Sequence, residues 1–298
     1  MMAPSVKMLF IGSVIILGIG CKKEHSPIPQ NDLKAFSDYW YQGKAEISSF
    51  ELSQSRYGAN HDGTAVMVFV TEDFSKSKFV KLDEPQKYLS DATRVLKFNM
   101  NKEFVTGIYN YSMMGSVYTP IDYDHFPHSL KVSSGIQDWC GQTYWQANWK
   151  GNRYEVQRFS YFETEGDSKY SLVNTWLEDE MWNKIRVAPN TLPVGEVKMI
   201  ASAFYLRLTH KPDKVYVAKT SVNKIGDHYT YTIHYPELSR TLAIDFETSF
   251  PHRILGWKES YGLNEVTTGK LIKTIMSDYW NHNHLEDEGL RDSLMLKH

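Results

Sequence analysis

The sequence is poor in cysteine, with only Cys21 and Cys140 among its 298 residues. A chain of this length with two thiols cannot rely on a disulfide framework, so its stability has to come from packing. Cys21 is assigned to a lipid below, which leaves Cys140 without a partner for an internal disulfide. Free cysteine is among the most buried residue types, so we expect Cys140 to be buried and inert, with a reactive or intermolecular thiol as the alternative.

The chain also lacks an excess of either charge and every common catalytic signature. It has 33 Lys and Arg against 35 Asp and Glu, which gives no electrostatic reason to expect nucleic acid as a partner. The P-loop, dinucleotide-binding, nucleophile-elbow, zinc-protease and Cys-x-x-Cys motifs are absent. A catalytic site assembled from distant residues stays open, but we favour a protein that is not an enzyme and expect no cofactor and no bound metal.

One apolar stretch, Met8–Gly20, follows the single charge of the N-terminal region, Lys7. Its 13 residues would extend about 20 Å as a helix, which is too short for a hydrocarbon core of roughly 30 Å. A basic start, an apolar stretch and small residues before a cleavage point are typical of a secretory signal. Residues 1–20 are therefore predicted to be a signal peptide, in preference to a transmembrane anchor.

The end of this stretch is similar to a bacterial lipobox. Gly18 and Gly20 precede Cys21, and the polar residues Lys22, Lys23 and Glu24 follow it. Leu is usual where Gly18 stands, and this relaxed form resembles lipoproteins of the Bacteroidota. The resemblance implies lipidation at Cys21 and attachment to a membrane. The residue after the cysteine is not the Asp of an inner-membrane retention signal, so we expect an outer-membrane lipoprotein, facing either the periplasm or the cell surface.

The mature chain is predicted to be a short tether followed by a folded body. Residues 21–34 are polar with two prolines, as in a lipidated linker. Residues 35–298 form a β-rich globular region, possibly with two subdomains divided near residue 190. The hydrophobic content of 42%, with 19 Tyr, 14 Phe and 8 Trp, indicates a folded protein.

Most of the body reads as antiparallel strands. Thr64–Thr71 is a continuous apolar run that predicts a strand buried on both faces. The segment from Thr143 to Glu163 predicts a hairpin around a turn at Gly151, with a bulge or a change of burial near Arg158. Further strands are predicted at 94–100, 196–200, 204–209, 215–223, 228–235, 240–250 and 253–261, with a strand or helix at 270–276 and a short helix at 286–296. The predicted fold is mainly β, with antiparallel curved sheets or a half-barrel and a few short helices.

One helix is predicted in the middle of the chain, over residues 175–185. Thr175 and Glu178 fit a capping box, and Leu177, Met181 and Ile185 would form its buried stripe. On this interpretation the neighbouring residues Asp179 and Glu180 face water. The helix is expected to end before Pro189.

The strongest candidate for a ligand site lies between Ser133 and Trp149. Amphipathic aromatic side chains beside amides suit a small-molecule or glycan pocket, although a β core with a polar seam has the same composition. The possible pocket residues are Gln137, Asp138, Trp139, Gln142, Trp145 and Trp149.

Two polar clusters are weaker candidates for cation binding. Imidazole and carboxylate groups suit zinc, and paired carboxylates suit hard cations. Both clusters lie where ordinary turns or a polar terminus are the simpler interpretation. The first cluster is His282, His284, Glu286 and Asp287, and the second is Asp122, Asp124, His125 and His128.

Three segments together resemble an uncharacterised family of Bacteroidota lipoproteins that often carries the name "septum formation inhibitor Maf". They are YWQANWKGNRYEVQRFSYFE, YTIHYPELSRTLAIDFETSFPHRILGWKE and SSGIQDWCG. The S-x-S-P-R-R-type motif of the cytoplasmic Maf nucleotide pyrophosphatases is absent. The resemblance implies an envelope lipoprotein and assigns no functional residue.

The leading hypothesis is a non-enzymatic envelope lipoprotein that binds a ligand or partner through its β scaffold. The partner would be a hydrophobic ligand, a glycan or an envelope protein. The alternatives are a hydrolase acting on envelope polymers, with scattered Asp, Glu or His residues as its site, and a structural lipoprotein of a membrane complex.

Overall fold

The computed structural model describes residues 26, 28–123, 125–262 and 264–296, and Cys21 and the expected signal peptide lie outside them. The fold is mainly β, with one large curved open sheet and a few short helices, which confirms the predicted class. The first half of the sheet consists of β1 (Ala45–Arg56), β2 (Ala59–Ser75), β3 (Ala92–Thr106), β4 (Tyr109–Pro120), β5 (Lys131–Asp138), β6 (Gly141–Trp149), β7 (Arg153–Ser160) and β8 (Ser168–Val173).

The second half of the sheet and the helical elements complete the chain. The remaining strands are β9 (Trp176–Leu177), β10 (Gly195–Ile200), β11 (Tyr216–Ile225), β12 (His228–Tyr235), β13 (Arg240–Glu247), β14 (Ile254–Tyr261) and β15 (Glu265–Ser277). The α-helices are α1 (Leu33–Trp40), α2 (Met181–Val187) and α3 (Ala203–Thr209), and the 3-10 segments are η1 (Pro85–Tyr88), η2 (Glu178–Glu180), η3 (Pro189–Thr191), η4 (Tyr279–Asn281) and η5 (Leu285–Leu294).

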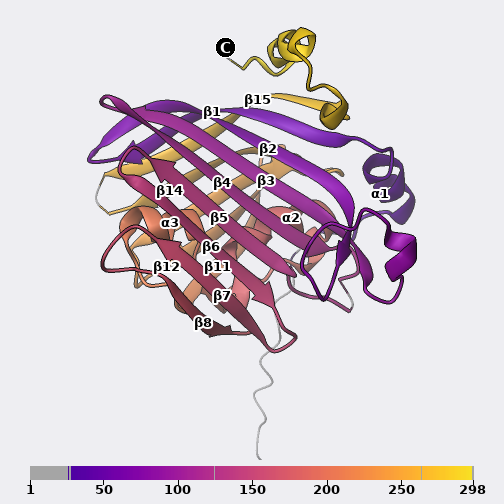
Figure 1. The fold of residues 1–298 in the computed structure, drawn as a ribbon, viewed down its shortest axis with the longest axis horizontal. Coiled ribbons are helices and arrows are strands. Elements are labelled where there is room, and N and C mark those ends of the chain that lie inside the picture. Colours follow the sequence, from indigo (N-terminus) through magenta and orange to yellow (C-terminus); the bar gives the residue numbers. More distant parts are fainter. Residues whose placement is uncertain (1–25, 27, 124, 263, 297–298) are drawn as a thin grey trace, which may run out of the picture.

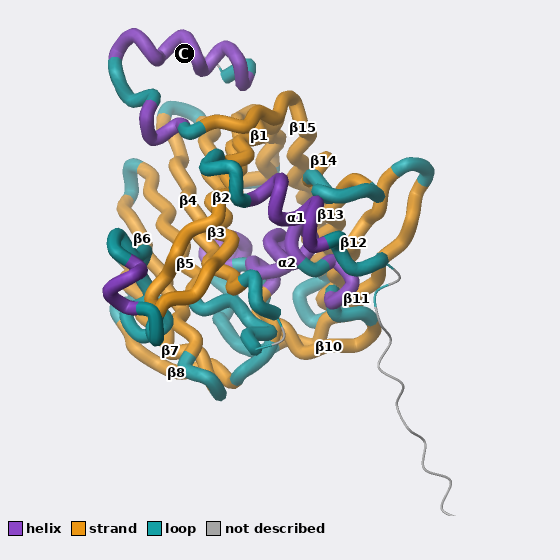
Figure 2. Tube along the Cα trace, turned by 90° about the vertical axis from the view of Figure 1, so that its right-hand side faces the viewer, coloured by secondary structure: helices purple, strands orange, loops and turns teal. Residues whose placement is uncertain are grey.

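The sheet is a meander folded back on itself. Its strand order is β8-β7-β6-β5-β4-β3-β2-β1-β15-β14-β13-β12-β11-β10-β9, so β1 and β15 join two runs of neighbouring strands. Figure 1 shows the two runs as a front and a rear layer, with α2 and α3 between them. The two runs are here called the two walls of the sheet. In Figure 2 these walls face each other across α2, and β1 and β15 connect them at the top. The helices therefore fill the concave side of the sheet.

The predicted hairpin between residues 143 and 163 is confirmed as β6 and β7. Trp149 pairs with Tyr154 and Trp145 with Arg158, and no register shift interrupts the pairing. The irregularity expected near Arg158 is absent from β7, because burial alternates regularly along the strand: Tyr154 lies on the buried face, and Phe159, which is 46% exposed, lies on the opposite face. The aromatic residues at the end of β7 thus face solvent.

The strand predicted to be buried on both faces is confirmed within β2, and a C-terminal segment accounts for the second face. Met67 and Phe69 belong to the main core, whereas Val68 and Val70 pack in a separate cluster with Leu294 of η5. In Figure 2 the C-terminal segment lies above β1 and β15, outside the concave side. The predicted C-terminal helix is thus present in 3-10 form.

The helix predicted over 175–185 begins later than expected. Its helical turns are η2 and α2, and Thr175 donates to Lys198 O instead of capping them. Glu180, and not Glu178, closes the first turn by accepting a hydrogen bond from Leu177 N at 3.1 Å. The expectation that Asp179 and Glu180 face water is wrong for Glu180, which is 2% exposed. Asp179 is partly exposed, but only toward a cavity described below.

Residues 178–187, here called the central segment, join both walls of the sheet through buried polar contacts. Arg186 forms a two-pronged ion pair with Glu46 of β1, at 2.6 and 2.5 Å. Asn183 donates to Leu96 O of β3 at 2.9 Å. On the other wall, Glu178 accepts two hydrogen bonds from Arg240 of β13, at 2.5 and 2.6 Å. The central segment is thus held against the sheet by charge pairing as well as by apolar packing.

The remaining strand predictions are confirmed except at 204–209. The strands predicted in 94–100, 196–200, 215–223, 228–235, 240–250 and 253–261 correspond to β3 and β10–β14, and 270–276 lies in β15. Residues 204–209 form α3 instead of a strand. Ser202 accepts a hydrogen bond from Phe204 N at 3.3 Å, and Asp179 accepts one from Ala203 N at 3.0 Å, so both groups satisfy the first turn of a helix.

Part of the stretch expected to be a tether packs against the body. Ile28 is 3% exposed and belongs to the main core, and the Asn31 side chain donates to Val187 O at 2.8 Å. The packed body thus includes residues before 35. None of the helices in the described residues is long and apolar enough to span a membrane.

The Arg186–Glu46 pair generates a stability prediction. Both side chains are at most 1% exposed, and loss of one partner leaves an uncompensated buried charge, so Arg186→Met should lower the free energy of unfolding by about 3–5 kcal/mol. Urea denaturation followed by circular dichroism measures this change.

The matched control is Lys34→Met, which removes the exposed Lys34–Asp38 pair and should change the free energy of unfolding by no more than about 0.5 kcal/mol. An Arg186 variant no less stable than the Lys34 variant would contradict the assignment.

Candidate functional site

The six residues predicted as a ligand pocket do not line a single cavity. Gln137, Asp138, Trp139 and Gln142 lie beside Asn110 on an open surface hollow at the β5–β6 turn. Trp139 is 70% exposed there, and its indole N–H donates to Asn110 at 3.0 Å. A ligand at this hollow would remain largely in solvent.

The two other tryptophans of the predicted set point elsewhere. Trp149 donates to Asn174 at 3.1 Å and packs edge-on against Phe126. Trp145 donates to Asp213 at 3.0 Å and borders a deeper cavity beneath α3. Of the six, Trp145 therefore has the surroundings of a ligand-binding residue.

The expectation that Cys140 is buried is wrong. Cys140 is exposed, because it lies with Trp139 in the tight turn between β5 and β6. The carboxylate of Asp138 raises the pKa of the Cys140 thiol above its ordinary value. A higher pKa means less thiolate at neutral pH, so the position does not favour a reactive cysteine.

The two polar clusters considered for cations form local ion pairs, except that His128 is buried and contacts Glu180 at 3.2 Å. His282 lies 3.3 Å from Asp278 and 3.5 Å from Asp287, and His125 lies 2.9 Å from Asp122. Asp124 is outside the described residues. Across the described ranges no group of three or more His, Cys, Asp or Glu side chains is placed to hold a metal ion.

The cavity beside Trp145, here called the outer cavity, has a volume of about 350 Å³. It lies between α3, the loop that follows this helix, and strands β6 and β7. The side chains that give it its character are Trp145, Arg158, Glu165, Arg207, His210 and Asp213. Arg207 lies in the last turn of α3, and His210 follows the helix as its left-handed C-cap residue; both line the cavity.

The charges around the outer cavity are only partly matched. Arg158 pairs with Asp213 at 3.4 Å, and His210 pairs with Glu165 at 2.7 Å. Arg207 donates from Nε to Thr143 at 3.2 Å and lies 4.0 Å from the ring centre of Phe162. Among the described residues no carboxylate forms an ion pair with Arg207.

Burial makes the Arg207 charge unfavourable without a counterion. Removal from water lowers the pKa of Arg207, and the more distant Glu165 only partly offsets this effect. An Arg guanidinium can donate two parallel hydrogen bonds to a carboxylate or phosphate, which makes Arg the usual residue for binding such groups. The outer cavity therefore has the electrostatics of an anion site.

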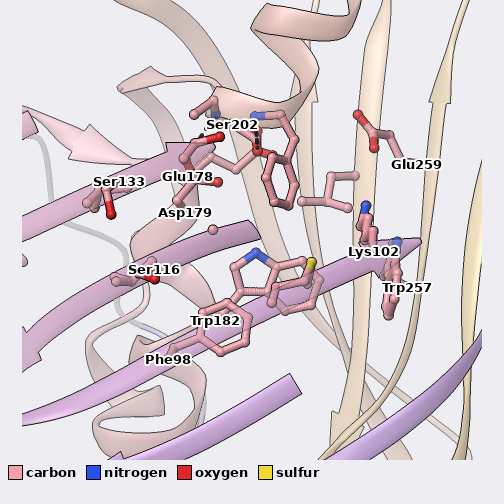
Figure 3. A pocket seen from close by; sticks show the side chains of 18 of the residues that line it. Phe98, Lys102, Ser116, Ser133, Glu178, Asp179, Trp182, Ser202, Trp257 and Glu259 are labelled. Atoms are coloured by element: carbon pink, nitrogen blue, oxygen red, sulfur yellow. Dashed lines mark hydrogen bonds between the residues drawn. The ribbon is translucent and has the colours of Figure 1, made fainter. Parts of the chain in front are cut away.

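A second, smaller space of about 40 Å³, the inner cavity, lies between the central segment and both sheet walls. Figure 3 shows Glu178 and Asp179 on one side, Lys102, Trp257 and Glu259 on the other, and Trp182 below. Arg240 connects two of the acids, because its Nε donates to Glu259 at 2.7 Å while its terminal nitrogens bind Glu178. Ser134 and Ala203 border both cavities.

Asp179 is an inner-cavity acid whose pKa is raised above its ordinary value. Burial raises its pKa from the ordinary value to about 6, against the opposing hydrogen bond from Ala203 N. Asp179 can thus exchange a proton closer to neutral pH than an ordinary aspartate does, while Glu178 and Glu259 are bound by Arg240.

No local pattern indicates Arg207 as a site residue, because the sequence predicts a strand over residues 204–209. The alternation of Phe204, Leu206 and Leu208 favoured that prediction. The cap at Ser202 was the local feature that could have indicated a helix.

Comparisons with known proteins add no family. No family model and no curated protein matches the chain. Among solved structures, the Aeromonas veronii immune modulator A aligns with 84% of this chain and 97% of its own, at 9% identity and a TM-score of 0.15. A TM-score this low carries no argument about fold or function.

Asp179 generates a prediction about pH. A carboxyl group with a raised folded-state pKa binds its proton more tightly in the folded than in the unfolded chain, so its ionisation destabilises the fold as the pH rises from about 4 to about 6. Asp179→Asn cannot ionise and should be more stable than the parent at pH 7.5 by about 2 kcal/mol, with equal stability at pH 4.

Urea titrations at both pH values test this difference. Asp38→Asn is the control because Asp38 is exposed on α1. A gain for Asp179→Asn at pH 4 as large as that at pH 7.5 would show that titration is not its cause.

Proposed function

We propose that this protein is a membrane-anchored envelope lipoprotein that binds a small organic anion in the outer cavity and catalyses no reaction there. The ligand would carry a carboxylate or phosphate group together with a flat or apolar part. The observation that supports this proposal most directly is Arg207, a partly buried cation on the cavity wall with no ion-pair partner among the described residues.

The size and lining of the outer cavity agree with such a ligand. Its volume of about 350 Å³ falls within the range of roughly 300–1,000 Å³ that is usual for small-molecule sites. Trp145, Leu206 and Pro212 provide apolar surface, and Arg207 and Lys211 provide positive charge. A purely hydrophobic ligand suits this wall less well, because it would leave the cations without partners.

The hydrolase alternative has weaker support. The carboxylates Glu178, Asp179 and Glu259 do converge, but the space between them is only about 40 Å³. That volume holds a few water molecules and not the ring of a sugar unit. A polymer would need another site.

Attachment to the outer membrane through Cys21 is part of the proposal. Ile28 is already packed in the body, so the six residues 22–27 would separate Cys21 from it. The seven Cα–Cα steps from Cys21 to Ile28 reach at most about 25 Å. The binding body would therefore stay near the membrane surface, whether in the periplasm or outside the cell.

The anion site predicts a specific loss of binding. Arg207→Gln keeps a hydrogen-bond donor and most of the side-chain volume but removes the charge. Loss of a hydrogen bond to a charged group costs about 1.5–3 kcal/mol, so the dissociation constant of an anionic ligand should rise about 10- to 100-fold. The measurement is a thermal-shift screen of organic carboxylates and phosphates, followed by calorimetric titration of any that stabilise the protein.

Arg153→Gln is the matched control, because Arg153 lies at the exposed start of β7 and pairs only with exposed Glu155. It should leave the dissociation constant unchanged. Equal weakening in both variants would indicate general electrostatics, and a screen in which no anion binds the parent protein would refute the proposed function.

The anchor makes a separate prediction. Cys21→Ala removes the sulfur that would receive the lipid, so the variant should lose membrane attachment or remain unprocessed. Fractionation of cells, with mass measurement of the N-terminal peptide, checks this outcome. Cys140→Ala is the control and should remain attached. Unchanged membrane retention of Cys21→Ala would count against lipidation at that position.

A further inference from the structure

Lys102 is a buried amine that faces the inner cavity without a partner. It lies on β3 and is 6% exposed. Its Nζ lies 5.3 Å from the ring centre of Trp257 and 5.6 Å from that of Phe204. Within the described part of the chain it forms no hydrogen bond and no ion pair, and Figure 3 shows it beside Glu259 and Trp257 on the cavity wall.

A lysine in this position is less stable as a cation than one in water. Burial lowers the pKa of Lys102, and Arg240 adds to the effect, while Glu259 opposes it. Desolvation beside another cation is one of the ways in which proteins prepare a lysine as a nucleophile. A larger fraction of Lys102 is therefore present as the neutral amine than for a lysine in water.

The other charges of the inner cavity indicate what kind of molecule could enter. Three carboxyl groups and two basic groups line it, and Arg240 is already bound to Glu178 and Glu259. An anion would meet an acidic wall, and a cation would meet Lys102. A neutral electrophile is compatible with both, and the hydroxyl groups of Ser116 and Ser134 on the cavity wall can donate hydrogen bonds to its oxygen.

We propose that the inner cavity is a covalent site in which Lys102 condenses with a short neutral aldehyde to form an imine. The Nζ lone pair forms a bond to the carbonyl carbon, and a proton passes from nitrogen to the carbonyl oxygen. The resulting hydroxyl group leaves as water after a further protonation, while Nζ loses its remaining excess proton. The balance is one amine and one aldehyde giving one imine and one water.

Asp179 provides a suitable proton source on the opposite side of the same cavity. With a pKa of about 6, it exchanges protons readily with water in the cavity at neutral pH. The space of about 40 Å³ corresponds to about three water-sized groups, which limits the aldehyde to two or three carbon atoms.

Reductive trapping tests the proposal. The purified full-length chain is treated at pH 7 with acetaldehyde and cyanoborohydride, and peptide mass spectrometry measures the rate of ethylation at each lysine. Burial lowers the pKa of Lys102 and so increases its neutral fraction, and Lys102 lines the inner cavity. It should therefore be ethylated several-fold faster than Lys34, whose side chain is 84% exposed.

Lys184 is an internal control within the same protein. Burial lowers its pKa to about 8, but it is enclosed by Tyr123 and Trp176 and does not line the inner cavity. It should remain unmodified, because it does not line the inner cavity. Two results would overturn the proposal. One is ethylation of Lys184 as fast as that of Lys102, and the other is ethylation confined to surface lysines.

Two variants complete the test. Lys102→Met should abolish the fast ethylation while keeping the circular dichroism spectrum of the parent, and if this variant fails to fold, the comparison within the parent protein still decides. Arg207→Gln should leave the ethylation rate of Lys102 unchanged. The imine site and the anion site can therefore fail independently.

Discussion

The fold depends on charge pairing inside a curved sheet. A sheet bent this far has to enclose something, and here the enclosed central segment carries Glu178, Glu180, Lys184 and Arg186, each at most 2% exposed. Buried ions are tolerated only when partners compensate their loss of water. The sheet supplies ion-pair partners for Arg186 in Glu46 and for Glu178 in Arg240. Glu180 accepts a hydrogen bond from Ser129 N, and Lys184 lies over the rings of Tyr123 and Trp176.

The need for ion-pair partners determines the position of α2 as well as the stability of the fold. An apolar helix can shift or rotate against an apolar wall with a modest change in energy, whereas Arg186 and Glu178 have defined partners at the two ends of the central segment. Asn183 adds a third point by donating to main-chain oxygen on β3. The orientation of α2 is thus determined by directional contacts, and the spaces left around it keep their shape.

The two cavities differ because different walls border them. The inner cavity lies among the ion pairs and has more acids than bases, while the outer cavity lies at the far end of α3, where Arg207 has no acidic partner among the described residues. Ser134 and Ala203 border both, so the two cavities lie next to each other.

Local sequence patterns predicted the local structure well and the interior poorly. The β6–β7 hairpin and the strands around it follow from alternation and turn residues, which act over a few positions. The burial of Asp179 and Glu180 could not be predicted in this way, because charged residues normally lie at the surface. Their burial depends on contacts with distant residues, such as the hydrogen bond that Glu180 accepts from Ser129 N. Arg207 was missed for the same reason, since the helix that positions it depends on Asp179, a residue 24 positions away from Ala203.

The order of strands has a consequence for how the chain assembles. Every neighbouring pair in the sheet is consecutive along the chain except β1 and β15, where Ala45 lies opposite Ser277. Pairs that are close in sequence form with little loss of chain entropy, whereas a pair this distant forms slowly. During synthesis the first eight strands can associate early, but β1 keeps one free edge until nearly the whole chain has emerged. Unpaired edges are where other strands add, so the interval before closure is when this chain is most exposed to aggregation.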